Sequence, residues 1–477
     1  MLARLIFCLS LLLAAVPAAA QFMTPENEAE IGRQEHPKIL KEFGGAYPDP
    51  ALGAYVAGIG LRLARASDRP DIAYTVTVLN AAMVNAFALP GGYVYVTRGL
   101  MALADTEAEL AGVLAHEIGH VTARHSAARY NKGMLAQLGV GILGALGGGG
   151  LAQALGLGAQ VYLQGFSREQ EFEADQLGVR TLVRAAYRPE AMAGFLAKLG
   201  DQSRVDAQMA GRPPGEVDRF DMMATHPRTP DRVGRAMQAA ADLPRPDNAS
   251  DGREEYLRRI DGMIYGDDPK EGLVRGRAFV HPALRLRFEV PPGFRLVNGS
   301  DQVAAYGPGG AAIRFTMARS RSADPAQHIA REWGANLPLG GVEALSVAGL
   351  PAAAARADVR LDSGPAVLRL VAIRGEWPQG GTAMYRFLFL STPQAARELD
   401  RPFRDTVYSF RRLSAEEAAG IRPLRIRLHR VAPGDTPAAL IARMPAGPFQ
   451  AERFAALNGL PPGLIPPVGD LVKLVAE

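Results

Sequence analysis

The sequence predicts three structural units: a mostly α-helical domain with a small β-sheet over residues 21–266, an α+β domain over residues 273–413 and a small βααβ module over residues 425–477. A chain of 477 residues has room for roughly two to four domains. Helical periodicity dominates the first half, whereas short strand-like runs between Pro and Gly turns dominate the second. Residues 414–424 are expected to form a linker before the last unit. The expected fold class is therefore multidomain.

The first twenty residues have the layout of a secretory signal peptide. Arg4 precedes an apolar run over residues 5–16, and three alanines end at Ala20. The run is short for a membrane span, and Cys8 lies in its middle rather than at the cleavage point. We expect cleavage after Ala20 and export to the periplasm of a Gram-negative-type bacterium. An uncleaved N-terminal anchor is the alternative.

The composition describes an ordinary globular chain and excludes several classes of function. Hydrophobic residues make up 48% and charged residues 21% of the chain. The 53 Lys and Arg are interspersed with 49 Asp and Glu, so the net charge of +4 gives no strong field for binding nucleic acid. The single cysteine excludes disulfide scaffolds, cysteine-based zinc fingers and iron–sulfur clusters.

Two strand-like runs, 72–79 and 92–97, interrupt the helical pattern of the first domain, and β-branched and aromatic residues dominate both. As an edge strand beside a catalytic centre, the second run could bind an extended peptide through main-chain hydrogen bonds. An ordinary core strand with one buried face is the alternative. The candidate substrate-binding residues are Gly92, Tyr93, Val94 and Tyr95.

The strongest chemical signal is the pentapeptide His116-Glu117-Ile118-Gly119-His120. Thr106 and Glu109 have the spacing of a capping box, so the segment reads as a helix. His116 and His120 then project from one face, as two ligands of a zinc ion must. Glu117 lies close enough to accept a proton from a water on the metal without coordinating it. A surface helix with two solvated histidines is the alternative.

A catalytic zinc ion needs a third protein ligand and one open position. Three glutamates in the helical segment 167–184 compete for this role, and Glu171 is favoured over Glu169 and Glu173. Small residues on the face that carries Glu171 would let this helix approach the histidines closely. Asp175, one turn further, is placed to accept the free ring N–H of a ligating histidine.

Two further histidines, His125 and His226, are candidates for a role at the metal. His125 does not fit the three-histidine pattern HExxHxxGxxH, because Ala123 and Ser126 stand where Gly and His are required, so it is not expected to be a ligand. His226 lies in an extended segment before Pro227. It could stabilise an oxyanion or cap the fourth zinc position, and a structural histidine is the alternative.

Residues 135–164 form an apolar stretch that is rich in glycine. Nine glycines between 139 and 158 disfavour a transmembrane helix, because each costs about 1 kcal/mol relative to alanine in a helix. We favour a flexible gate or a loop that contacts the membrane peripherally over a true span.

The second domain alternates strand-like runs with turns and carries no motif that assigns it a role. The runs cover residues 284–290, 311–317, 366–373 and 384–390. Helical stretches at 326–333 and 393–399 interrupt them, which indicates an α+β unit.

Four segments of the first domain, in the same order, resemble the family of BepA-like and HtpX-like zinc metallopeptidases, which also contains the CAAX prenyl endopeptidases. They are NAFALPGGYVYVTRGLM, LAGVLAHEIGHVTARH, SREQEFEAD and THPRTPDR, within residues 32–240. The resemblance implies a gluzincin-type peptidase domain, largely helical with a small sheet, that holds one zinc ion per subunit. It implies the ligands His116, His120 and Glu171, and Glu117 as the catalytic base. It further implies that Asp175 is the acid of the ExxAD motif, and that His226 gates or assists the zinc.

The last unit resembles a LysM module in LHRVAPGDTPAALIARM, ERFAALNGL and GDLVKLV, although Pro437 and an extra residue before Ile441 depart from that pattern. LysM modules usually bind N-acetylglucosamine polymers, so the resemblance implies peptidoglycan contact through residues 425–477. A module that only packs against its neighbours is the alternative.

The sequence therefore predicts a zinc metalloendopeptidase that hydrolyses peptide bonds of exported proteins in envelope protein quality control. Its expected substrates are polypeptides, including misfolded envelope or outer-membrane proteins. The alternatives are a non-hydrolytic periplasmic chaperone or assembly factor that keeps zinc for structure, and a peptidoglycan-binding adaptor.

Overall fold

The computed structural model describes residues 24–128, 165–209, 226, 230–243, 249–299, 301–361, 364–377 and 380–477. The signal peptide predicted over residues 1–20 and the glycine-rich segment 135–164 lie outside the described residues. Within them, no helix is long and apolar enough to cross a membrane.

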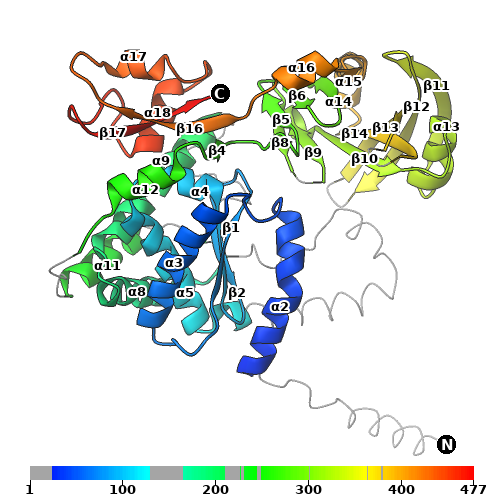
Figure 1. The fold of residues 1–477 in the computed structure, drawn as a ribbon. Coiled ribbons are helices and arrows are strands. Elements are labelled where there is room, and N and C mark those ends of the chain that lie inside the picture. Colours follow the sequence, from blue (N-terminus) through cyan, green and yellow to red (C-terminus); the bar gives the residue numbers. More distant parts are fainter. Residues whose placement is uncertain are drawn as a thin grey trace, which may run out of the picture.

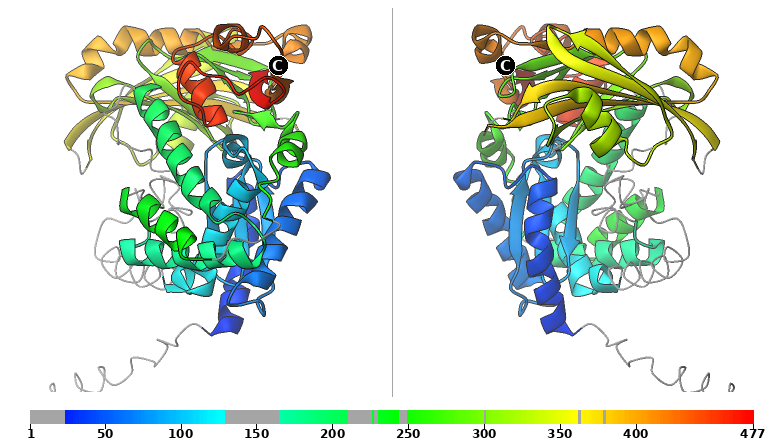
Figure 2. Two further views of the ribbon diagram at one scale, coloured as in Figure 1. Left: turned by 90° about the vertical axis from the view of Figure 1, so that its left-hand side faces the viewer. Right: turned by 90° about the vertical axis from the view of Figure 1, so that its right-hand side faces the viewer.

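The N-terminal domain is mainly helical, as predicted, and contains a small sheet (Figure 1). Its helices are α2 (Pro25–Glu42), α3 (Pro50–Ala66), α4 (Arg98–Leu103), α5 (Glu107–Thr122), α8 (Arg168–Arg184), α9 (Glu190–Met209), α11 (Pro230–Ala241) and α12 (Arg253–Ile260). Its sheet contains β1 (Thr75–Leu79), β2 (Ala86–Leu89) and β3 (Tyr93–Thr97) in the order β1-β3-β2. Helix α2 crosses one face of this sheet (Figure 2). Helix α3 contacts β1, and helix α5 contacts β2 and β3.

The position of β3 corrects one expectation. Residues 92–95 were expected to offer an edge strand, but β3 is the central strand: β1 pairs with it in parallel and β2 antiparallel. The main-chain groups of β3 therefore pair with β1 on one side and β2 on the other. The expectation of an edge strand there is wrong. Among the described residues, β2 pairs with no strand other than β3, so its outer side is an edge of the sheet. This edge is buried, and its Ala88 carbonyl oxygen accepts a hydrogen bond of 3.0 Å from the Ser126 hydroxyl.

The middle region is rich in β-structure. A seven-stranded sheet has the order β11-β12-β13-β14-β10-β9-β8, and a four-stranded sheet has the order β15-β7-β6-β5. The strands are β5 (Leu273–Arg275), β6 (Ala278–His281), β7 (Leu286–Glu289), β8 (Arg295–Asn298), β9 (Val303–Tyr306), β10 (Ala312–Arg319), β11 (Leu339–Val347), β12 (Leu350–Leu361), β13 (Gly364–Glu376), β14 (Thr382–Ser391) and β15 (Arg411–Arg412). The helical elements are η2 (Pro308–Gly310), α13 (Pro325–His328), η3 (Ile329–Trp333), α14 (Ala395–Glu398) and α15 (Asp400–Tyr408).

The strand predictions for this region are confirmed, because β7, β10, β13 and β14 overlap the four predicted runs. Its core is aromatic: Phe288, Phe315 and Phe387 have ring centroids 4.8–5.0 Å apart. Interlocking rings of this kind, contributed by both sheets, hold the two sheets together.

The last 54 residues, from Leu424 to Glu477, are called the C-terminal block below. Its elements are β16 (Leu424–Arg430), α17 (Pro437–Ile441), α18 (Gln450–Asn458) and β17 (Leu471–Ala476). This is the expected βααβ order, which by itself does not identify a LysM module. Strand β16 also pairs with β4 (Ile264–Tyr265), which follows α12.

The stretch predicted as a linker contains the short helix α16 (Ala415–Gly420). A capping box between Ser414 and Glu417 starts this helix. Leu413, Ala418 and Ile421 pack against β6, so most of the stretch lies on the middle region rather than spanning free space.

Candidate metal centre

Helix α5 begins with a side-chain cap and is buried along almost its whole length. The Thr106 hydroxyl accepts a hydrogen bond from the Glu109 amide at 3.0 Å. In a capping box the Glu109 carboxylate would accept a second hydrogen bond from the amide of the N-cap residue, Thr106. Here it accepts that bond from the amide of the preceding residue, Asp105, at 2.6 Å. His116, Glu117 and His120 are at most 3% exposed.

Two glycines bring α8 against α5. A Cβ atom on Gly119 of α5 would lie 2.8 Å from the Ala174 carbonyl oxygen. A Cβ atom on Gly178 of α8 would lie 3.1 Å from the His116 amide nitrogen. Any larger residue at either position would push the helices apart, so these glycines let the Glu171 carboxylate reach the histidines.

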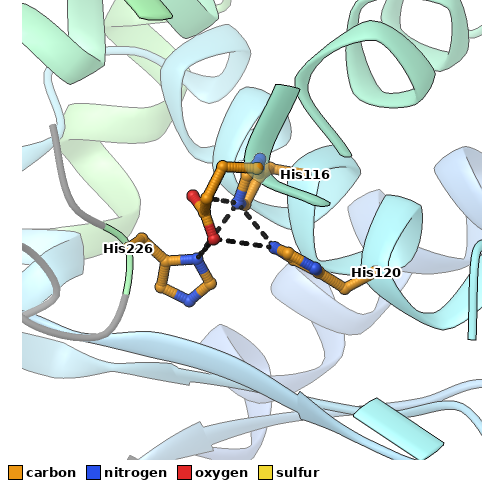
Figure 3. Close-up of side chains that lie close together, drawn as sticks. His116, His120 and His226 are labelled. Atoms are coloured by element: carbon orange, nitrogen blue, oxygen red, sulfur yellow. Dashed lines mark hydrogen bonds and ion pairs between the residues drawn. The ribbon is translucent and has the colours of Figure 1, made fainter. Parts of the chain in front are cut away.

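Four side chains converge at this contact: Glu171 and the three histidines labelled in Figure 3, which are His116, His120 and His226. The Nε2 atoms of His116 and His120 are 3.0 Å apart. Glu171 Oε1 lies 3.4 Å from His120 Nε2, and Glu171 Oε2 lies 3.7 Å from His116 Nε2. His226 Nδ1 lies 2.9 Å from Glu171 Oε1 and 3.2 Å from His116 Nε2. One ligand atom from each of the four residues lies within 4.8 Å of all the others.

These separations fit a metal ion. Ligand bonds of about 2.0–2.2 Å in a tetrahedral zinc site put the ligand atoms roughly 3.3–3.6 Å apart. The observed distances of 2.9–3.7 Å bracket that range. Two imidazole nitrogens and a carboxylate oxygen are also the donors that zinc prefers. The residues present therefore fit a zinc ion held by His116, His120 and Glu171, with His226 in the fourth place.

The electrostatics of the cluster also suit a cation. Burial alone would raise the pKa of Glu171, but the neighbouring histidines hold it well below its ordinary value. Burial lowers the pKa of His120 well below its ordinary range. Glu171 is therefore ionised and His120 neutral at neutral pH, which are the states that metal binding requires of these two ligands. Burial alone would lower the pKa of His116, but the Asp175 carboxylate outweighs it and raises that pKa, which favours the protonated ring in the absence of a metal.

Asp175 and Arg232 contact the cluster on the side of α8 and α11 and fix the orientation of His116 and Glu171. Asp175 Oδ1 lies 2.9 Å from His116 Nδ1, the ring nitrogen that faces away from the other ligand atoms. Arg232 of α11 forms hydrogen bonds of 2.8 Å from Nε and Nη2 to the two oxygens of Asp175. Its Nη1 contacts Glu171 Oε2 and donates to the His226 carbonyl oxygen at 3.3 Å. One guanidinium thus joins two acids of α8 to the residue that carries His226.

His125 supports His120 in a similar way. Helix α5 ends at Thr122, and Arg124 has a φ of 59°, so the chain reverses direction there. This turn places His125 Nδ1 3.0 Å from His120 Nδ1. His125 Nε2 lies 3.2 Å from Glu173 Oε2. His125 is not among the four converging residues, as expected, but it contacts one of them.

Glu117 and Phe166 complete the site. Glu117 is fully buried, and neither carboxylate oxygen has a hydrogen-bond partner among the described residues. The ring nitrogen His226 Nε2 lies 3.4 Å from Glu117 Oε1. The Phe166 ring stacks on the His120 ring with centroids 3.9 Å apart, which fixes the orientation of that imidazole.

Sequence reasoning brought together His116, Glu117, His120, Glu171, Asp175 and His226, and the structure places all six in one buried cluster. Residues 92–95 lie outside it: Tyr93, Val94 and Tyr95 belong to β3, and Gly92 precedes that strand. Three contributors were missed: Arg232, the His125–Glu173 pair and Phe166. Arg232 was visible as the last residue of THPRTPDR, but only the fold shows that α11 aims it at Glu171 and Asp175.

Comparison with known proteins agrees with this geometry. Residues 50–240 match the model of peptidase family M48. The beta-barrel assembly-enhancing protease of Yersinia pestis is 37% identical over 235 residues, which cover 46% of this chain and 45% of that protein. The protein of the same name from Escherichia coli strain K12 is 32% identical over 234 residues, covering 46% of each chain. The mitochondrial metalloendopeptidase OMA1 of Schizosaccharomyces pombe is 31% identical over 176 residues, covering 34% of this chain and 49% of that protein. The chain thus spans about half the length of the curated relatives it matches.

Proposed function

We propose, from the peptidase family M48 domain that residues 50–240 form, that this protein is a zinc-dependent metalloendopeptidase that hydrolyses peptide bonds of exported proteins. The observation that carries the proposal is the convergence of two imidazoles and one carboxylate beside a buried glutamate without a hydrogen-bond partner among the described residues. No cysteine or serine nucleophile is required for this chemistry.

His116, His120 and Glu171 would hold the zinc ion. Bound there, zinc would act as a Lewis acid that activates water and polarises the carbonyl of the scissile peptide bond. Asp175 orients the His116 ring through the contact of its Oδ1 with His116 Nδ1, and His125 supports the His120 ring at Nδ1. Fixed rings and an ionised Glu171 make the site ready for the metal before substrate arrives.

Glu117 is the proposed general base. Because its oxygens have no competing hydrogen bond among the described residues, they are available to the proton of the attacking water. Glu117 accepts that proton and transfers it to the nitrogen of the departing amine. No covalent bond between enzyme and substrate forms at any step.

His226 has two proposed roles, and the distances favour the first. With Nδ1 close to Glu171 and His116 and Nε2 close to Glu117, the ring stands where water and substrate must enter. His226 then caps the site and must move before cleavage. The second role is stabilisation of the oxyanion on the substrate carbonyl after that movement.

The outer edge of β2 is the proposed binding place for the substrate backbone, where a peptide would displace the Ser126 hydroxyl from the Ala88 carbonyl oxygen. An extended peptide can pair with an unpaired strand edge through main-chain hydrogen bonds, without selecting side chains. Helix α5 contacts β2, so a peptide on this edge would run beside the metal centre. Weak side-chain preference would suit substrates that are unfolded.

The proposed place of action is the periplasm, after removal of residues 1–20, in quality control of envelope proteins. The names of the bacterial relatives, beta-barrel assembly-enhancing proteases, support outer-membrane proteins as substrates. Peptidoglycan contact through residues 425–477 and peripheral membrane contact through residues 135–164 remain parts of this proposal. A chaperone that keeps zinc only for structure is the second candidate, and it is favoured if unfolded outer-membrane proteins bind but are not cut.

The test is digestion of an unfolded protein such as casein, and of a peptide library, by the mature protein with and without a zinc chelator. Cleavage that the chelator abolishes and added zinc restores is expected. Binding without cleavage would favour the chaperone, and cleavage that resists the chelator would exclude a metal-dependent mechanism.

A further inference from the structure

The C-terminal block shares one hydrophobic core with the N-terminal domain. Its buried side chains join the same hydrophobic cluster as those of α3, α5 and α9. They are Ile426, Val431, Leu440, Met444, Phe454, Leu457, Val472, Leu474 and Val475. In Figure 1 the block lies over α4, α9 and α12, and α18 contacts both α4 and α9. The block therefore completes the core of the domain that carries the metal centre.

A fully buried lysine lies at the centre of this contact. Lys473 of β17 is 0% exposed, and its ammonium lies 2.7–3.1 Å from the carbonyl oxygens of Ala102, Leu103 and Ala104. These are carbonyls at the C-terminal end of α4, which have no partner further along that helix. The ammonium also lies 2.8 Å from Asp105 Oδ1. A cation at this helix end satisfies the carbonyls and suits the helix dipole.

Asp105 extends the network into α5. Its other oxygen, Oδ2, accepts a hydrogen bond of 2.6 Å from Lys198 of α9. Lys198 also donates to both carboxylate oxygens of Glu109, at 2.8 and 2.9 Å. Glu109 stands in the first turn of α5, and its carboxylate holds the Asp105 amide. Two lysines from distant parts of the chain thus fix the joint between α4 and α5.

The motif that resembled LysM lies at the same contact. Asn458 holds the backbone of Lys473: its Oδ1 accepts from the Lys473 amide at 2.7 Å, and its Nδ2 donates to the Lys473 carbonyl at 3.0 Å. The next residue, Gly459, has a φ of 60°, and a Cβ atom there would lie 2.8 Å from the Lys198 side chain. Gly459 is therefore fitted to the N-terminal domain, and Asn458 fixes the backbone of the lysine that enters that domain. A freely attached module would require neither.

A buried ammonium is costly unless it is paired and fully hydrogen-bonded, and an apolar residue would fill the same space at lower cost. What the lysine provides is a fixed geometry, because its bonds are directional whereas apolar packing is not. Helix α5 then carries this geometry as a rigid, buried rod from Asp105 to the ligands His116 and His120.

We propose that Lys473 is a positioning residue of the metal centre. Its ammonium fixes the start of α5, and α5 fixes the positions of His116, Glu117 and His120. The inference of a catalytic effect rests on the proposed peptidase function, whereas the effect on metal binding does not.

The test uses the full mature chain with Lys473→Met, which keeps the length of the side chain and removes the charge. Ile426→Val is the matched control, because it trims the same core within the block without touching the ammonium network. Three quantities are measured well below the unfolding temperature: zinc affinity by chelator competition, the visible spectrum of the Co²⁺-loaded protein, and kcat and KM on a peptide substrate.

Lys473→Met is expected to lower kcat by about ten- to a hundredfold with KM changed by less than about threefold, because a small misplacement of catalytic groups costs rate. Zinc affinity should fall severalfold and the Co²⁺ spectrum should change, whereas Ile426→Val should leave all three readouts at the wild-type values. Wild-type kcat, zinc affinity and spectrum in folded Lys473→Met would overturn the proposal.

If Lys473→Met does not fold, Asp105→Asn decides the question, because it keeps the shape of the carboxylate and leaves the carbonyl contacts of Lys473 in place. It must then show the same changes, and wild-type behaviour would overturn the proposal. Zinc affinity and the Co²⁺ spectrum do not depend on hydrolysis. Absence of cleavage by the wild-type protein would therefore refute the proposed function while the positioning role is still tested.

Discussion

Arg232 of α11 binds both carboxylate oxygens of Asp175, with two hydrogen bonds of 2.8 Å. The same guanidinium contacts Glu171 and the His226 carbonyl, and both Arg232 and Asp175 are at most 3% exposed. The segment that carries His226 is therefore attached to the helix that carries the third ligand. A bidentate pair of this kind is strong and geometrically selective.

Replacing Arg232 should destabilise the protein strongly. Arg232→Leu leaves the carboxylates of Asp175 and Glu171 buried without their cation, which should lower the free energy of unfolding by about 3–5 kcal/mol. Arg232→Lys should recover only part of this, because one ammonium cannot reproduce the planar fork. Urea unfolding of the zinc-free proteins measures both. Equal stability of the lysine variant and the wild type would show that the fork geometry is unimportant.

The contact between His125 and His120 predicts an effect on metal binding. His125→Ala removes the group at His120 Nδ1 and should lower zinc affinity by about 10- to 100-fold, as loss of an outer partner usually does. His125→Asn should retain more affinity, because its amide can occupy the Nδ1 position. Glu173→Gln should have little effect, since the Glu173 side chain is 60% exposed. Chelator competition gives the three affinities, and an unchanged value for His125→Ala would refute the role.

His226→Ala separates the two roles proposed for that residue. If the ring caps the site, as its distances to Glu171 and Glu117 favour, the variant should cleave short peptides at least as fast as the wild type. If the ring stabilises an oxyanion, kcat should fall by about 10²–10³-fold. Steady-state kinetics on a short and a long substrate distinguish these outcomes. We expect the first.

The stability that Asp105 contributes should disappear in strong acid. Burial alone would raise the pKa of Asp105, but the ammonium groups of Lys473 and Lys198 outweigh it and lower the pKa to about 2. A carboxylate with a depressed pKa stabilises the folded state above its unfolded pKa of about 4, and this stability is lost as the pH falls through about 2. The expected loss is about 2 kcal/mol.

Urea unfolding of the wild type and of Asp105→Asn at pH 7, 5, 3 and 2 measures this loss. The stability advantage of the wild type over the variant should shrink between pH 4 and 2 and stay constant between pH 5 and 7. A constant advantage down to pH 2 would mean that Asp105 does not titrate in that window.

Local patterns predicted most chemical groups of the site because all of them except His226 lie on the two regular helices α5 and α8. The four-residue spacing of His116 and His120, and of Glu171 and Asp175, fixes which side chains share a face before any tertiary contact exists. The strand runs of the middle region were predictable for a similar reason, since their apolar and β-branched residues recur in short runs between turns.

What could not be predicted depends on tertiary order or on a single backbone angle. Whether β3 is an edge or a central strand is decided by β2, whose four residues are too few to stand out in the sequence. The contact of His125 with His120 depends on the left-handed conformation of Arg124, which a continued helix would not have. In the sequence, Lys473 is one charged residue within the apolar run LVKLV, and only the docked block shows what it binds.

The central claim is that Glu117 is the base of a zinc peptidase, and the most direct test is cleavage by purified Glu117→Gln beside His116→Ala. Glu117→Gln should bind one zinc ion per chain and lose about 10²–10⁴-fold in kcat, because its amide cannot accept the proton. His116→Ala should lose both zinc and activity. Full cleavage by zinc-loaded Glu117→Gln would contradict the account.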